Sequence, residues 1–168
     1  PVRITAYVDA NFAHDLVTRR SVTGILLLLN NTPIRWLCKR QKTVETATYG
    51  SELVAARITT ELILETRYML RSLGVHIDGP ALMLGDNMSV ISNTAVPSSV
   101  LKKKHCAINY HRVREAIAGK ILRFAKIPSS ENLADVLTKP LGRQQFHCLI
   151  RKYLFRVPKT LGTALGTK

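Results

Sequence analysis

Apolar and polar positions along the first half of the chain predict two kinds of regular structure. Residues 4–10 are extended and mostly apolar, which predicts a first strand. The leucine-rich run 22–29 and the alternating run 34–38 predict a hairpin, because the turn-forming residues 30–33 lie between them. From about residue 46 to residue 73 the apolar period becomes helical. The stripe expected to face the core is Val54, Ile58, Leu62, Met69 and Leu73.

The second half of the pattern alternates between strands and helices. Residues 81–86 form a continuous apolar run ending in a carboxylate, as expected of a strand buried on both faces. Residues 121–127 predict another strand, and helices are expected over 87–93, 108–118, 131–138 and 144–155. This order predicts a mixed α/β sheet, with antiparallel strands first and helical crossovers later. We expect one domain over residues 1–157 and a basic flexible tail over 158–168.

The charge of the chain is the first indication of its partners. The 25 Lys and Arg residues against 11 Asp and Glu residues give a net charge of +14 over 168 residues. So basic a protein favours a polyanion, most commonly a nucleic acid. A solvated basic surface with no specific partner is the plain alternative. An anionic membrane is another candidate, but no long basic amphipathic helix supports it and no apolar run could span a bilayer, so no membrane partner is expected.

Cysteine usage and the start of the chain bear on compartment and context. The three cysteines form no Cys-x-x-Cys pair, which favours a reducing, intracellular compartment, cytoplasmic or nuclear, and argues against secretion. His105-Cys106 and His147-Cys148 could offer four zinc ligands, but adjacent residues rarely both reach one tetrahedral ion. The chain opens on Pro1 without a signal-peptide pattern and is expected to be a segment of a longer polypeptide.

Four of the acids stand out by their positions. Asp9 lies inside the first strand, Glu52 in the first turns of the long helix, Asp86 at the end of the buried strand and Asp135 on a late helix. A strand and the strand reached by a helical crossover are commonly neighbours, which would bring Asp9 and Asp86 together. Clustered carboxylates need cations between them, and oxygen donors select Mg²⁺ or Mn²⁺. Two such ions about 4 Å apart are the usual device for displacement at a phosphate.

Each acid also has an ordinary alternative. Asp9 and Asp86 could cap the ends of strands or form ion pairs with arginines. Glu52 could complement the N-terminus of the helix, and Asp135 could be a first-turn residue. The four together, in this element order, favour a phosphate-processing metal site.

Several stretches are similar to one known family, the ribonuclease H domain of copia-type LTR retrotransposon Gag-Pol polyproteins. The resemblance covers about residues 5–155 in order. Its motifs are Tyr7-Val8-Asp9-Ala10-Asn11-Phe12-Ala13, Arg20-Ser21-Val22-Thr23-Gly24, Trp36-Leu37-Cys38-Lys39-Arg40-Gln41-Lys42-Thr43-Val44, Ser51-Glu52-Leu53-Val54-Ala55, Gly85-Asp86-Asn87, Lys104-His105, Tyr110-His111-Arg112-Val113-Arg114-Glu115 and Asn132-Leu133-Ala134-Asp135-Val136-Leu137-Thr138-Lys139-Pro140-Leu141.

This resemblance implies a ribonuclease H-like fold, a five-stranded mixed sheet with helices on both faces. It also implies that Asp9, Glu52, Asp86 and Asp135 are the catalytic residues and the metal ligands. The implied activity is hydrolysis of the RNA strand of RNA–DNA hybrids during reverse transcription, leaving 3′-hydroxyl and 5′-phosphate ends. Two Mg²⁺ ions, for which Mn²⁺ can substitute, would assist. The reverse transcriptase portion of the same polyprotein is the implied protein partner.

Contacts to the nucleic acid are expected from six further residues. Asn11 and Asn87, beside the catalytic aspartates, could read the 2′-hydroxyl in the minor groove, although their amides could equally form local turns. Gln41 could reach the same groove from the basic connector. Phosphate contacts are expected from Arg20, Lys42 and Thr43.

The tryptophan and two of the histidines are considered separately from the acids. Trp36 alternates with Arg35 and is expected in the core. Many relatives place a His before the last Asp, where residues 128–132 of this chain hold none. His105 and His111 are the candidates to assist product release, although packed or surface positions would explain both.

Two rival hypotheses remain beside the nuclease. A domesticated ribonuclease H-fold module could bind nucleic acid or protein without cutting. A basic ribosomal or chromatin-type protein would explain the charge but not the acids.

Overall fold

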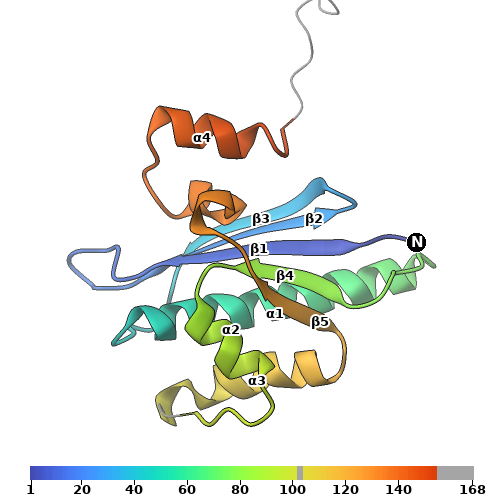
Figure 1. The fold of residues 1–168 in the computed structure, drawn as a ribbon, viewed down its shortest axis with the longest axis horizontal. Helices are drawn as coiled ribbons and strands as arrows, with labels where there is room; N and C mark the ends of the chain where they lie inside the picture. Colours follow the sequence, from blue (N-terminus) through green and yellow to red (C-terminus); the bar gives the residue numbers. More distant parts are fainter. Residues whose placement is uncertain (102–103, 155–168) are drawn as a thin grey trace, which may run out of the picture.

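A five-stranded sheet in the order β3-β2-β1-β4-β5 lies at the centre of the molecule (Figure 1). The computed structural model describes residues 1–101 and 104–154. Strand β1 (Ile4–Asn11) pairs antiparallel with β2 (Val22–Leu29), which pairs antiparallel with β3 (Thr32–Arg40). On its other side β1 pairs parallel with β4 (Ala81–Gly85), and β4 with β5 (Leu122–Lys126). The predicted mixed sheet is therefore confirmed, and β1 and β4 are neighbours.

Helices cover both faces of this sheet. The three helices α1 (Thr48–Ser72), α2 (Met88–Ala95) and α3 (Ala107–Ala118) lie on one face (Figure 1). The short 3₁₀ helix η3 (Leu133–Leu137) and α4 (Arg143–Ile150) lie on the other. Two further 3₁₀ turns, η1 (Lys104–Cys106) and η2 (Ser129–Glu131), precede α3 and η3.

The alternation of side chains along the strands builds one core on each face. On β1, Ala6 and Val8 join the larger core, which includes Leu53 and Ile63 of α1. On the opposite face Tyr7 packs against a smaller core formed by Leu26, Leu28, Leu133 and Leu149. Asp9 follows the same alternation as Tyr7, so its side chain points to the face that carries η3.

Several predicted elements differ in extent from the structure. The hairpin turn is only Asn30 and Asn31, both with positive φ (48° and 68°), so β3 begins at Thr32 rather than at residue 34. The late helix expected over 131–138 is instead the two turns η2 and η3. Helix α4 ends at Ile150, and the expected tail over 158–168 lies outside the described residues.

The buried side of α1 is also different from the predicted stripe. Met69 and Leu73 are exposed, whereas Thr59, Thr60 and Thr66 are buried. Each of these threonine hydroxyls donates to the carbonyl four residues earlier, at 2.8–2.9 Å, and so enters the core without an unpaired polar group.

The expectation that Trp36 lies in the core is wrong. Its side chain is 68% exposed, because β3 is an edge strand and most of its residues are solvent-accessible.

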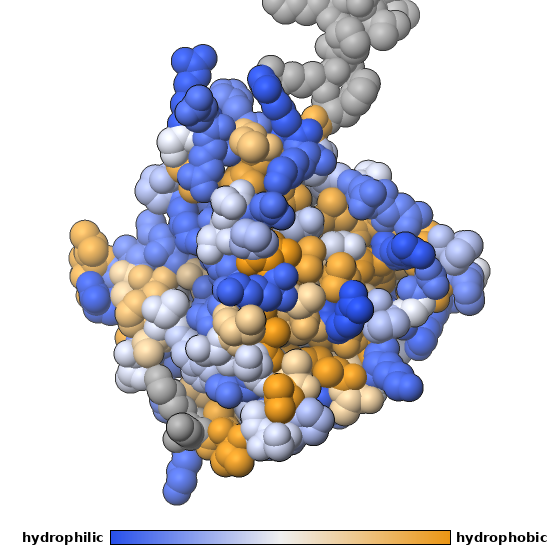
Figure 2. Space-filling model, viewed as in Figure 1, coloured by the Kyte–Doolittle hydropathy of each residue, from blue (hydrophilic) through white to orange (hydrophobic). Residues whose placement is uncertain are grey.

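Hydrophilic side chains gather over α4, at the top of Figure 2. Within residues 1–101 and 104–154, no helix has both the length and the apolar character that a membrane span needs.

Candidate active site

The carboxylate of Asp9 lies on the sheet face that η3 covers, and it is buried there. Only 1% of the residue is exposed. The Thr138 hydroxyl donates to Oδ2 of Asp9, and the Lys139 ammonium lies 3.1 Å from Oδ1. Both oxygens of this acid are therefore held by two consecutive residues that follow η3.

Asp86 and Asp135 lie beside Asp9. Asp86 directly follows β4, which runs parallel to β1, and Asp135 belongs to η3. One carboxylate oxygen from each of the three aspartates lies within 4.8 Å of the other two. The predicted proximity of Asp9 and Asp86 is confirmed, and η3 adds the third acid.

Asn132 fixes η3 against the sheet. Its amide nitrogen donates to the carbonyl of Val8 at 3.0 Å, while its oxygen accepts from the backbone N–H of Ala134 at 3.1 Å. The residue is fully buried. One side chain thus caps η3 and joins it to the strand that carries Asp9.

A glycine lets η3 approach the sheet this closely. Gly24 of β2 is the cross-strand partner of Asp9. A Cβ atom at this position would lie 2.5 Å from the Cγ2 atom of Thr138 and 3.0 Å from the carbonyl oxygen of Ala134. Any larger residue would therefore push away the segment that supplies Thr138 and Asp135.

Glu52 reaches the same end of the sheet from the first turns of α1. The residue is only 8% exposed. Burial, together with the charges of Asp9 and Asp86, raises the pKa of Glu52 to about 9. Its carboxyl is therefore protonated at neutral pH in the metal-free protein. Burial also raises the pKa of Asp135, although its hydrogen bond from Lys139 opposes this rise.

Lys139 is the cation of this cluster and is not among the site residues expected from the sequence. Its ammonium lies 3.0 Å from Oδ1 of Asp135 and 3.1 Å from Oδ1 of Asp9. Burial disfavours the charged form, but the charge of Asp9 and the bonds to both aspartates outweigh it and raise the pKa of Lys139 to about 12. The four-residue spacing from Asp135 was the available signal for this pair.

The donor atoms of the acidic cluster suit a hard divalent cation. They are carboxylate oxygens from β1, from the residue that follows β4 and from η3, with Glu52 beside them. Such a set fits Mg²⁺ or Mn²⁺ better than softer metals, which prefer nitrogen or sulfur. Asp9, Asp86, Asp135 and Glu52 are the residues that would hold such ions.

Relatives of this chain occur in plant retrotransposons. No family model matches the chain. It is 31% identical over 161 residues, 95% of its length, to the Retrovirus-related Pol polyprotein from transposon RE2 of Arabidopsis thaliana. It is 32% identical over 143 residues, 85% of its length, to the corresponding polyprotein from transposon TNT 1-94 of Nicotiana tabacum. The chain is a homologue of retrotransposon Pol polyproteins. It spans 11% of the length of each of these two relatives.

Solved structures give the fold of this Pol homologue. The LC11-RNase H1 structure in complex with an RNA/DNA hybrid has a TM-score of 0.61 at 13% identity, covering 81% of this chain and 94% of that one. The foamy viral protease-reverse transcriptase in complex with an RNA/DNA hybrid has a TM-score of 0.52 at 14% identity, covering 82% of this chain and 19% of that one. The Pol homologue therefore has a ribonuclease H-like fold.

Two of the residues expected to contact nucleic acid have structural roles in the Pol homologue. The amide of Asn11 lies 3.0 Å from Nδ1 of His14 and donates to the carbonyl of Thr138 at 2.9 Å. Asn87 caps α2 by accepting from the backbone N–H of Val90. The local roles of these amides, which the sequence left open, are therefore present.

Gln41 is buried in this structure. It is 3% exposed, and its amide nitrogen donates to the Thr23 hydroxyl and to the Ser51 carbonyl at 2.9 and 2.8 Å. The side chain therefore joins β2 to α1 inside the protein, and its contact with a nucleic acid stays a prediction. Lys42 and Thr43 are exposed, and Arg20 is partly buried in the loop before β2.

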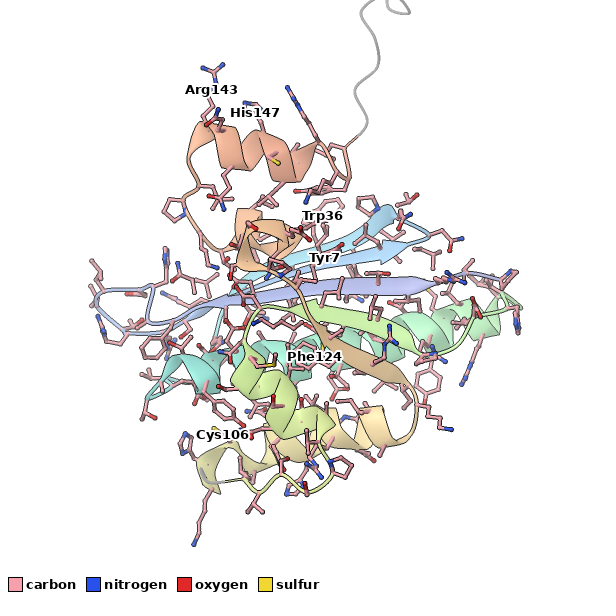
Figure 3. The ribbon with its side chains drawn as sticks, in the orientation of Figure 1. Tyr7, Trp36, Cys106, Phe124, Arg143 and His147 are labelled. Carbon is pink, nitrogen blue, oxygen red and sulfur yellow. The ribbon has the colours of Figure 1, made fainter. Side chains whose placement is uncertain are left out.

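The two histidines considered for product release, His105 and His111, lie with η1 and α3 on the face opposite to η3. Nε2 of His105 lies 3.6 Å from the buried Glu45 carboxylate, and His111 of α3 is exposed with its ring against Tyr110. Figure 3 shows Cys106 and His147 on opposite sides of the sheet. The two His-Cys pairs are therefore too far apart to share one zinc ion.

Proposed function

We propose that this chain is a ribonuclease H, a divalent-metal-dependent endonuclease that hydrolyses the RNA strand of RNA–DNA hybrids. The single observation that carries the proposal is the clustering of Asp9, Asp86 and Asp135 within 4.8 Å in a ribonuclease H-like fold. Its homology to retrotransposon Pol polyproteins supports the same activity. We further propose that it acts inside the cell during reverse transcription.

Two of the four acids, Asp9 and Glu52, differ in the parts proposed for them. Two divalent ions, when bound, supply an activated water and charge stabilisation at the leaving oxygen. Asp9 provides a rigid anchor, because β1 and the Thr138 hydroxyl fix its carboxylate. Glu52 holds a proton on its carboxyl and would release it to solvent on binding a cation, because a nearby positive charge lowers the pKa of an acid.

The proposed substrate matches the charge of the chain. A net charge of +14 attracts a nucleic-acid backbone. Lys42 and Thr43 are exposed beyond the end of β3 and are proposed to contact phosphates, together with Arg20. Asn11 and Asn87, each next to or near a catalytic aspartate, are proposed to reach the 2′-hydroxyl after local rearrangement.

The solved structures support the choice of ligand and of partner. The LC11-RNase H1 and foamy viral proteins were both solved with an RNA/DNA hybrid. The matching part is 19% of the foamy viral protease-reverse transcriptase chain. We therefore propose a hybrid as substrate and the reverse transcriptase portion of a Pol polyprotein as partner.

A labelled RNA–DNA hybrid incubated with Mg²⁺ tests this function. The wild-type chain is expected to cut only the RNA strand, leaving 3′-hydroxyl and 5′-phosphate ends. Asp86→Asn is expected to abolish cleavage. Asp78→Asn is a matched control, since Asp78 is an exposed acid paired with Arg3. It is expected to cut like the wild type.

The rival hypothesis predicts a different outcome of the same assay. A non-catalytic module would bind the hybrid with an affinity that falls steeply with salt and would leave the RNA intact. Hybrid binding without cleavage by the wild-type chain at any Mg²⁺ concentration would overturn the proposed nuclease.

A further inference from the structure

The Lys139 ammonium lies between two of the proposed metal ligands. Its nitrogen is 3.1 Å from Oδ1 of Asp9 and 3.0 Å from Oδ1 of Asp135, and both carboxylates are almost completely buried. Within residues 1–101 and 104–154, no other Lys, Arg or His forms an ion pair with either acid. The metal-free cluster therefore depends on this one side chain for its charge balance.

Charge shows why the cluster needs a cation of its own. One carboxylate oxygen from each of Asp9, Asp86 and Asp135 lies within 4.8 Å of the other two. Buried like charges at such distances are strongly unfavourable unless a positive charge separates them. The Lys139 ammonium offsets the charge of two of these three carboxylates, those of Asp9 and Asp135.

An ion that binds these carboxylates needs the same oxygens. Mg²⁺ binds oxygen at about 2.0–2.1 Å, well inside the distance of an ammonium hydrogen bond. An ammonium already bonded to both Oδ1 atoms would repel such an ion and block its approach. The Lys139 side chain is 34% exposed, so its flexible stem has solvent to move into.

We propose that Lys139 is a built-in counter-ion that stabilises the metal-free site and must leave Asp9 and Asp135 before a divalent ion binds there. Lys139 thereby sets the Mg²⁺ concentration at which the site loads. This inference rests on the proposed function, because it takes the acidic cluster as the metal site.

Lys139→Met tests the inference without any cleavage assay, since Met keeps much of the length and removes the charge. Magnesium affinity is measured by calorimetry without nucleic acid, and melting temperature is measured in EDTA and in excess Mg²⁺. The variant is expected to bind Mg²⁺ about tenfold more tightly than the wild type. It is expected to melt at a lower temperature than the wild type in EDTA. Its melting temperature is expected to rise more than that of the wild type when excess Mg²⁺ is added.

Two further variants keep the test informative. Lys152→Met removes an exposed charge beyond α4 and is expected to behave like the wild type in both measurements. Lys139→Arg keeps the positive charge and is expected to retain the EDTA melting temperature of the wild type. If Lys139→Met folds only with Mg²⁺, the inference is supported, because the ion then replaces the lost ammonium.

Other results would overturn the inference. They are an unchanged or weaker Mg²⁺ affinity in Lys139→Met, or a variant that stays unfolded even in excess Mg²⁺. Tighter Mg²⁺ binding by the variant, combined with a wild-type chain that cuts no hybrid, would refute the nuclease and leave the counter-ion role standing. The two failures are therefore distinguishable.

Discussion

At the scale of single residues, the site is a balance between four acids and one lysine. Asp9 and Asp135 share the Lys139 ammonium, and Glu52 avoids a further charge by remaining protonated. When a buried acid holds a proton that it loses on unfolding, the free energy of unfolding depends on pH. The metal-free protein should therefore report the state of Glu52 through its unfolding.

The pKa of Glu52 predicts the sign of this pH dependence. Its folded value of about 9 lies above the ordinary value of 4.5, so between these pH values the folded state binds more protons than the unfolded state. The free energy of unfolding is therefore expected to fall as pH rises from about 6 to about 9 in EDTA. Denaturant unfolding of the wild type and of Glu52→Gln measures it.

The Glu52→Gln variant serves as the control for that slope. Gln cannot ionise in either state, so the free energy of unfolding of the variant should lack this slope, and its excess over the wild type should grow as pH rises from about 6 to about 9. Parallel curves for the two proteins would contradict a protonated Glu52.

At the scale of elements, the site depends on how closely η3 approaches the sheet. Asn132 bonds η3 to β1, and Gly24 leaves the space that Thr138 and Ala134 occupy. The third acid of the cluster is therefore positioned by the packing of a 3₁₀ turn on strand β2, rather than by a strand of its own.

Gly24→Ala should displace this turn. The new methyl would meet Thr138 Cγ2 at 2.5 Å and the backbone oxygen of Ala134 at 3.0 Å. Overpacking of this kind costs about 1–3 kcal/mol, which thermal unfolding would measure as a lower melting temperature. Mg²⁺ affinity should fall as well, because Asp135 moves with η3.

Gly142→Ala is the matched control for that substitution. A Cβ atom at Gly142 has no neighbour within 4 Å among the described residues, and its φ of −60° suits alanine. Equal changes of melting temperature and Mg²⁺ affinity in the two variants would show that the lack of space at Gly24 does not cause the loss.

The elements also show how far the sequence alone could lead. Strand and helix periods located the sheet, because these signals are local, and the expected pairing of the first strand with the strand after the long helix placed Asp9 beside Asp86. The structure brings Asp9 and Asp86 together as this pattern suggested, and η3 adds Asp135. Their metal binding and catalytic roles stay predictions.

What the sequence could not provide depended on long-range packing. Which of 25 basic residues meets a buried acid is decided by the turn after η3, so Lys139 was missed. The buried face of α1 was misplaced because threonine hydroxyls satisfy themselves on the helix backbone. Trp36 was assigned to the core because strand alternation does not reveal that β3 is an edge strand.

At the scale of the whole molecule, charge determines how the substrate is found. The net charge of +14 predicts hybrid binding that weakens as salt rises, since bound phosphates release counter-ions. Lys42 follows the end of β3, which pairs through Val22 of β2 with the Asn11 end of β1, so it lies toward the acidic site.

The salt dependence can therefore be assigned to particular residues. Lys42→Met is expected to lower the slope of log affinity against log salt by about one, as for a single phosphate contact. Fluorescence anisotropy of a labelled hybrid measures it. Lys120→Met, which precedes β5 at the opposite end of the sheet, should leave the slope unchanged. Equal slopes for all three proteins would exclude a phosphate contact at Lys42.

The acidic cluster is proposed to use divalent ions to cut RNA in a hybrid. The most direct test of this proposal is the single-turnover cleavage rate measured against Mg²⁺ concentration. The wild-type rate should rise from zero with a log–log slope approaching about two at low Mg²⁺, because two ions are required. Asp86→Asn should show no cleavage over the same range. A rate independent of Mg²⁺, or an unchanged curve for Asp86→Asn, would contradict the account.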